Sequence, residues 1–266
     1  MTRSHFSQLF PDLRTGGEHF TDPALRAWID QRRNAAAAHE LAAASFPGAR
    51  PEIAQQLRAA FSASAAVFAP LRVTPPPPEV FHTAGVSWAG FGKFIDAVSD
   101  PATGADPERF LFVVTPHGLG LEAWKRLFDG AVKLSIATDI AEHFDIVDSP
   151  PTGVVSPATR SVGHVNKLLW TVRAVSTAAA PEFRNVSWRK HPTVSLPEML
   201  TVQLLAQRAG AELLDPHSFT WLSGVFSHGR LAPRHTFDTS TATIRVSSRA
   251  VGNQAPHMGA RLSYPN

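Results

Sequence analysis

The stretch from Phe219 to Asn266 holds the side chains best suited to chemistry. It combines five arginines and three histidines with a single side-chain carboxylate, Asp238. These basic residues are Arg230, Arg234, Arg245, Arg249, Arg261, His228, His235 and His257. A planar guanidinium binds carboxylate or phosphate through parallel hydrogen bonds, and a neutral imidazole can act as a general base. The stretch therefore predicts a site for an anion.

Within this stretch, residues 227–235 read as a hairpin connection. If it folds back, His228, Arg230, Arg234 and His235 converge on one anion. Asp238 would then orient one histidine, leaving His228 or His235 as a catalytic base. The competing interpretation is a solvated basic loop.

Three further positions are candidates for ligand binding. His117 begins the sequence His-Gly-Leu-Gly between a predicted strand and a predicted helix. Backbone N–H groups at such a helix start can bind an anion, although an ordinary tight turn explains the same residues. Asn253 and His257 lie near the end of the chain, where His257 could equally be a hydrogen-bonded loop residue.

Other chemistry has little support in the sequence. There is no cysteine, and His228 and His235 lack the close spacing of metal ligands, so we expect neither metal nor cofactor. Ser223 lies in Trp-Leu-Ser-Gly, which is not a nucleophile elbow. A basic run beside Trp188 is short and the net charge is only +3, so nucleic acid is not the expected partner.

The composition is that of a folded protein that can bury a large core. Hydrophobic residues make up 44% and charged residues 18%. The start of the chain lacks the apolar run of a signal peptide, and no segment looks able to cross a membrane. We therefore expect a cytoplasmic protein without membrane contact. The bias towards Ala, Arg and Pro suggests a GC-rich, actinobacterial source.

An N-terminal pair of helices is predicted before the core. An irregular lead-in over residues 1–21 precedes a helix from Asp22 to about Phe46, and Pro51 opens a second helix that runs to Phe68. Four prolines follow at 75–78 and favour a stiff connector. These features predict a helical pair at 1–74, a connector at 75–80 and a core at 81–266. The pair would cover a sheet or form a homodimer arm.

The core is predicted to be α/β or α+β, with a mixed sheet and covering helices. A strand at 110–115, a helix at 121–128 and a strand at 132–136 predict a parallel pair with a right-handed crossover. Ser195 and Glu198 form a capping-box pattern that opens a helix to about Arg208. The remaining predicted elements are a short helix at 91–98, another at 138–144, and strands at 167–176, 219–226, 241–247 and 260–264.

The order of several short sequences is also familiar. They are Val113-Val114-Thr115, Leu121-Glu122-Ala123-Trp124, His143-Phe144-Asp145-Ile146, Asn185-Val186, Val194-Ser195 with Glu198, and Gly252-Asn253. Together they resemble an actinobacterial family known as domain of unknown function 5701, over about Glu108 to Ser263. Gly252, Asn253 and Gly259 are the best matches. The family's cysteines and tryptophans before Gly-Asn are absent here, and Pro256-His257 lies two residues further on. The resemblance implies a shared α/β fold and a cytoplasmic setting, and no activity.

We expect a module that binds a small anionic ligand or a protein partner through the Arg/His-rich C-terminal stretch. The main alternative is a metal-independent acid–base enzyme that uses the same residues. A nucleic-acid-associated protein is the third reading. A histidine with a shifted pKa inside a closed pocket would favour the enzyme, whereas a pocket without a paired base would favour the binding module.

Overall fold

The computed structural model describes residues 27–32, 44–99, 109–128, 130–160, 167–189 and 194–265. The chain divides into two compact units, Met1–Leu41 and Ala42–Asn266. In the first unit, residues 27–32 are helical, and the Arg32 guanidinium lies 5.3 Å from the centre of the Trp28 ring. The predicted lead-in and most of the predicted first helix lie outside the described residues. Helices α3 to α9 and strands β1 to β10 all belong to the second unit.

Helix α3 (Pro51–Phe68) is the first long element of this unit, and it confirms the predicted second helix. Pro51 fits its first turn, and a stripe that includes Ile53, Leu57 and Phe68 is buried. The other helices are the 3-10 turn η2 (Ala69–Leu71), α4 (Pro78–Thr83), α5 (Trp88–Val98), α6 (Leu121–Leu127), α7 (Thr138–Ala141), α8 (Phe144–Val147) and α9 (Leu196–Ala209).

The strands of the described residues form two sheets, so the expected mixed α/β class is confirmed. In the four-stranded sheet, β4 (Leu168–Ser176) pairs antiparallel with β1 (Phe110–His117), β3 (Ala158–Thr159) and β10 (Ser263–Tyr264). The six-stranded sheet is mixed and has the order β2-β8-β7-β6-β9-β5. Its strands are β2 (Lys133–Ile136), β5 (Phe183–Arg184), β6 (Phe219–Trp221), β7 (Leu231–Asp238), β8 (Thr243–Ala250) and β9 (Met258–Ala260).

The predicted parallel pairing of the first two core strands is wrong. β1 pairs antiparallel with β4, whereas β2 lies in the other sheet and pairs parallel with β8. The expected strand, helix and strand are all present, but the connection leads from one sheet to the next. A local sequence pattern does not specify which distant strand supplies the partner.

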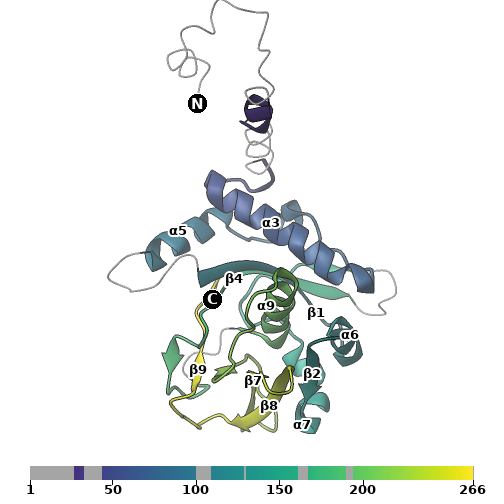
Figure 1. The fold of residues 1–266 in the computed structure, drawn as a ribbon, viewed down its shortest axis with the longest axis vertical. Coiled ribbons are helices and arrows are strands. Elements are labelled where there is room, and N and C mark those ends of the chain that lie inside the picture. Colours follow the sequence, from purple (N-terminus) through teal and green to yellow (C-terminus); the bar gives the residue numbers. More distant parts are fainter. Residues whose placement is uncertain are drawn as a thin grey trace, which may run out of the picture. The chain divides into compact units, whose positions relative to one another are not determined.

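Helix α9 lies between the two sheets, as Figure 1 shows. It packs against β1 and β4 on one side, and its Gln203 reaches His235 of β7 on the other. Residues 196–204 are therefore buried on every face. The predicted capping box is confirmed, because Ser195 Oγ accepts from the Glu198 N–H while Glu198 accepts from the Ser195 N–H.

The proline run does not separate compact units. Helix α3 packs against β1 and α9, and Ser64 of α3 donates a hydrogen bond to the Val114 carbonyl of β1. Phe68 at the end of α3 contacts Trp124 and Trp170 edge-on. The predicted boundary at 75–80 therefore lies within the compact unit Ala42–Asn266, and the division into domains stays a prediction.

No helix of the described residues is long and apolar enough to span a bilayer.

Candidate anion-binding site

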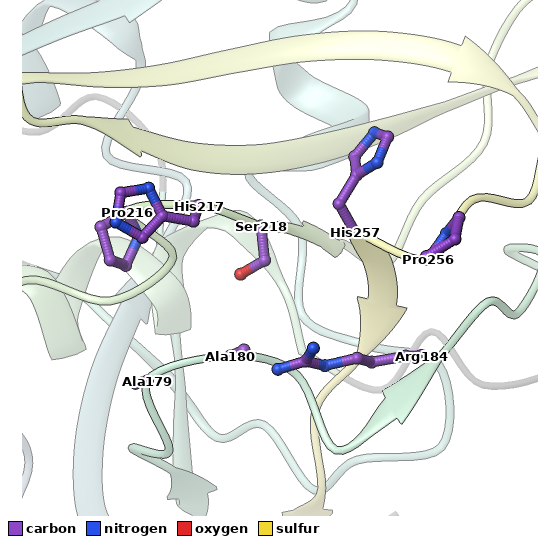
Figure 2. Close-up of a pocket in the computed structure, with 8 residues that line it drawn as sticks. All are labelled: Ala179, Ala180, Arg184, Pro216, His217, Ser218, Pro256 and His257. Carbon is purple, nitrogen blue, oxygen red and sulfur yellow. The ribbon is translucent and has the colours of Figure 1, made fainter.

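A surface hollow of about 390 Å³ lies beside the edge of the six-stranded sheet. Figure 2 shows the Arg184 side chain along one side of the hollow, with His217 and His257 on the opposite side and their rings directed away from Arg184. The rest of the lining consists of Ala179, Ala180, Pro216, Ser218 and Pro256. One arginine and two histidines thus contribute to a lining that includes no Asp or Glu.

Arg184 is held in place by the edge strand β5. This strand pairs antiparallel with β9, with Arg184 opposite Gly259. A side chain at Gly259 would overlap the carbonyl oxygen of Phe183, so the close approach of the two strands requires glycine. The Asn185 N–H also donates to the Met258 carbonyl, at 2.8 Å. The base of the arginine is therefore fixed, while its side chain is exposed.

His217 and Ser218 belong to a turn that is anchored by Asp215. Asp215 has a left-handed backbone with φ of 64°, a conformation that Asp tolerates better than most residues. Its carboxylate accepts hydrogen bonds from Ser218 Oγ at 3.0 Å and from Thr220 Oγ1 at 2.6 Å. Its backbone N–H donates to the carbonyl of Ala179, on the neighbouring part of the lining. The turn is therefore preorganised before any ligand arrives.

Arg261 neutralises the buried charge of Asp215. The guanidinium is fully buried and lies 2.5 Å from the carboxylate, and it also donates to the carbonyls of Ser176 and Ala178. Burial by itself would raise the pKa of Asp215, but Arg261, His235 and Thr220 lower it to about 2. Because this carboxylate is compensated, it does not make the hollow negative.

His235 belongs to the same buried network. Its Nδ1 lies 3.0 Å from Asp215 Oδ2, and its Nε2 lies 3.0 Å from the amide nitrogen of Gln203. The carboxylate can only accept and the amide nitrogen can only donate, so Nδ1 carries the proton and Nε2 accepts. Both ring nitrogens are engaged and the side chain is fully buried. This geometry leaves His235 no lone pair with which to act as a base.

The predicted cluster of His228, Arg230, Arg234 and His235 does not converge. Residues 227–230 form a tight turn in which Ser227 and His228 are both left-handed, and His228 and Arg230 are exposed. Residues 231–238 are not a loop but the strand β7. Successive side chains of a strand point to opposite faces, so Arg234 and His235 lie on opposite sides of the sheet.

Asp238 does not orient a histidine. It pairs with Arg245 at 2.6 Å and accepts from the hydroxyl of Ser240. The hydrogen bond from Ser240 is the main reason that its pKa is lowered to about 2. The carboxylate that orients His235 is Asp215, which the sequence did not single out.

The turn after His117 already holds an anion from the chain itself. The Gly120 N–H donates to the carboxylate of Asp148 at 2.8 Å, and the Gly118 N–H donates to the Asp148 carbonyl. His117 is fully buried, with its Nε2 3.0 Å from Thr171 Oγ1, and burial lowers its pKa to about 4. The prediction that these N–H groups bind an external ligand is therefore wrong, because both already donate to Asp148.

Of the two remaining candidates, His257 lines the hollow and Asn253 does not. Asn253 lies in an exposed turn, where its N–H donates to the Ala250 carbonyl. The backbone of His257 is fixed, since its carbonyl accepts from the Phe219 N–H at 2.7 Å. Its ring lies 5.7 Å from that of Phe219.

Arg184 and His217 were missed by the sequence interpretation. Both are single basic residues in short irregular segments, far from His257 in the chain. The Asp-Pro sequence before His217 indicates a turn, but it does not reveal what the turn faces. Over the described part of the chain, no group of three potential metal ligands comes together.

Comparison with known proteins adds no relative, because no family model, curated protein or solved structure matches the chain.

Proposed function

We propose that this protein is a binding module for a small anionic ligand, and that the ligand is held in the hollow between Arg184, His217 and His257. The observation that carries this proposal is that one arginine and two histidines line the hollow, whereas no Asp or Glu does. Ligand sites typically combine an apolar rim with a few convergent polar groups, and alanine and proline supply that rim here.

The ion pairs of the described residues support this assignment. They involve arginines 50, 173, 245 and 261, and none of them includes Arg184. The nearby Glu182 is engaged elsewhere, where it accepts from Ser176 Oγ and from the Leu262 N–H. Arg184 therefore keeps its charge available for a ligand, and its planar fork suits a carboxylate or phosphate.

The lining of the hollow is held in place before a ligand binds, which favours a preformed binding site over one that must close around its ligand. The buried Asp215 network ties together the 176–180 segment and the 215–218 turn, which form much of the lining. A preorganised site loses less conformational entropy when the ligand binds. The same network uses both ring nitrogens of His235, and His228 lies in an exposed turn, so neither histidine of the enzyme alternative lines the hollow.

Thermal denaturation and calorimetry with anionic metabolites at constant ionic strength would test the proposal. A ligand present at a hundredfold excess over its dissociation constant stabilises the folded state by roughly 2.7 kcal/mol. Arg184→Ala should abolish the response to the bound metabolite. Arg230→Ala is the matched control, because Arg230 is also exposed but lies in the hairpin turn and does not line the hollow. Equal losses in both variants, or no loss in Arg184→Ala, would refute the assignment.

A further inference from the structure

Arg234 differs from the other buried arginines of the described residues. Arg173 lies 3.3 Å from the carboxylate of Glu198, and Arg261 lies 2.5 Å from that of Asp215. Arg234 is only 9% exposed, yet no Asp or Glu of the described residues forms an ion pair with it. A buried charge is costly unless it is paired, so an arginine without a carboxylate requires an explanation.

The contacts of Arg234 fix its guanidinium without balancing its charge. The group lies over the Phe219 ring, 3.9 Å from its centre. Its Nε donates to Ser247 Oγ at 3.1 Å, and its Nη1 lies 4.0 Å from Met258 Sδ. A hydroxyl and a thioether are weak, neutral acceptors for a group with five N–H donors. The guanidinium is thus oriented while much of its donor capacity is unused.

A second arginine lies close by on the same face of the sheet. In the pairing of β7 with β8, Arg234 is opposite Ser247 and Ala232 is opposite Arg249. Arg249 is therefore a diagonal neighbour of Arg234, a relation that allows long side chains to interact. Burial lowers the pKa of Arg234 to about 10, and the charge of Arg249 adds to this effect. Arg249 is exposed and has no ion-pair partner among the described residues.

We propose that Arg234 and Arg249 form a binding site for the phosphoryl group of a small molecule on the face of the six-stranded sheet that points away from α9. Two positive charges without a carboxylate match a dianion better than a monoanionic carboxylate. Each guanidinium can donate two parallel hydrogen bonds to phosphate oxygens. Neither arginine lines the hollow, but the two sites are neighbours, because the Phe219 ring contacts both Arg234 and His257.

Arg245 provides a matched control within the same strand. Because it lies two residues before Ser247, it shares the face of Arg249, but its charge is balanced by Asp238 at 2.6 Å. Replacing Arg245 by alanine removes an arginine from the same face as replacing Arg249 does. The charge that it removes, however, is one that Asp238 balances.

The test measures binding of inorganic phosphate, by calorimetry or phosphorus NMR, to the full chain at constant ionic strength. Arg184→Ala serves as the host, so that the hollow does not contribute. The host should bind phosphate, with acetate at least tenfold weaker. Adding Arg249→Ala should weaken phosphate binding by tenfold or more, whereas adding Arg245→Ala should change it by less than twofold. Arg234→Met should act like Arg249→Ala, and the exposed position of Arg249 keeps the test valid if that variant does not fold.

Several results would overturn the site. They are an absence of phosphate binding by the Arg184→Ala host, equal losses in the Arg249→Ala and Arg245→Ala variants, and binding to anionic-lipid vesicles or oligonucleotides without binding to inorganic phosphate. The hollow is tested separately, by measuring metabolite binding to the Arg249→Ala variant, in which Arg184 is intact. Failure of one site is therefore distinguishable from failure of the other.

Discussion

The two faces of the six-stranded sheet differ in whether a carboxylate balances the charge of the buried arginine. On the face towards α9, Arg261 is matched by Asp215, and His235 and Thr220 complete the network. On the other face, Arg234 rests on Phe219 with only a hydroxyl and a thioether as acceptors. A compensated charge stabilises the fold and leaves little for a ligand, whereas an uncompensated charge costs stability and attracts an anion. Charge balance therefore separates structural arginines from candidate ligand-binding arginines.

The largest expected effect follows from removing the compensating carboxylate. Asp215→Asn keeps a residue that tolerates the left-handed backbone but removes the carboxylate that neutralises the buried Arg261. We expect a loss of about 3–5 kcal/mol in the free energy of unfolding, measured by urea denaturation. Ser218→Ala removes one hydrogen bond from an uncharged donor to the same carboxylate and should cost about 1.5–3 kcal/mol. A loss below about 1 kcal/mol for Asp215→Asn would mean that the inner face does not depend on charge balance.

Replacing each arginine by methionine compares the two faces directly. Arg261→Met leaves Asp215 buried and unpaired, so we expect a loss of at least about 3 kcal/mol. Arg234→Met removes a charge that no carboxylate balances and keeps an apolar contact with Phe219. Its stability should stay within about 1 kcal/mol of that of the unmodified chain, because apolar replacement of buried charge is often neutral or stabilising. Similar losses at both positions, measured in the same urea titration, would remove the distinction.

Asp148 differs from Asp215, because it is a buried acid that forms no ion pair with any described residue. Burial raises its pKa to about 6, against the lowering effect of the N–H groups that donate to it. A carboxyl whose pKa is raised on folding makes the folded state more stable as pH falls from about 6 to 4. His117, with a pKa lowered to about 4 by burial, has the opposite effect and loses stability as pH falls from about 6.5 to 4.

The two effects should nearly cancel, and a single substitution should separate them. Asp148→Asn removes the titrating acid, so its stability should fall by about 2–3 kcal/mol as pH decreases from 6.5 to 4.5. The unmodified chain should show a much flatter profile over the same range. Urea denaturation at half-unit pH steps measures both. Parallel profiles for the two proteins would show that Asp148 does not take up a proton in this range.

The elements with strong local signals were predicted from the sequence. Pro51 and a regular apolar stripe specify α3, and the capping box of Ser195 and Glu198 specifies the start of α9. Both depend on residues within a few positions of one another. By contrast, Glu198 also pairs with Arg173, and that contact depends on the long-range packing of α9 against β4.

Strand β7 was missed because its inward face does not look apolar. The inward positions include Pro233 and His235 between Leu231 and Phe237, which breaks the expected alternation. A histidine is stable there because Gln203 and Asp215, from distant segments, satisfy both of its ring nitrogens. The sequence of the strand alone contains no trace of these partners.

The candidate site was predicted only in its chemistry. An Arg/His-lined anion site was expected near the C-terminus, and His257 lies in the hollow, but Arg184 and His217 come from other segments. The resemblance to the actinobacterial family stays a prediction, as does a homodimer through the N-terminal helices. Gly259 has a structural requirement of its own, because β5 approaches β9 too closely for a side chain.

The smallest expected effect concerns Arg245, which tests whether charge balance or net charge governs anion binding on the outer face. Arg245 and Asp238 lie at 2.6 Å, but Arg245 is half exposed and Asp238 is partly exposed, so water and salt screen their attraction. Arg245→Ala should therefore leave the urea midpoint and the phosphate affinity unchanged within error, at both low and high salt. Arg249→Ala changes net charge equally and lies on the same strand face, yet it should weaken phosphate binding tenfold or more. If the two variants behave alike, net charge rather than charge balance governs anion binding on this face, and the uncompensated state of Arg234 is only a structural cost.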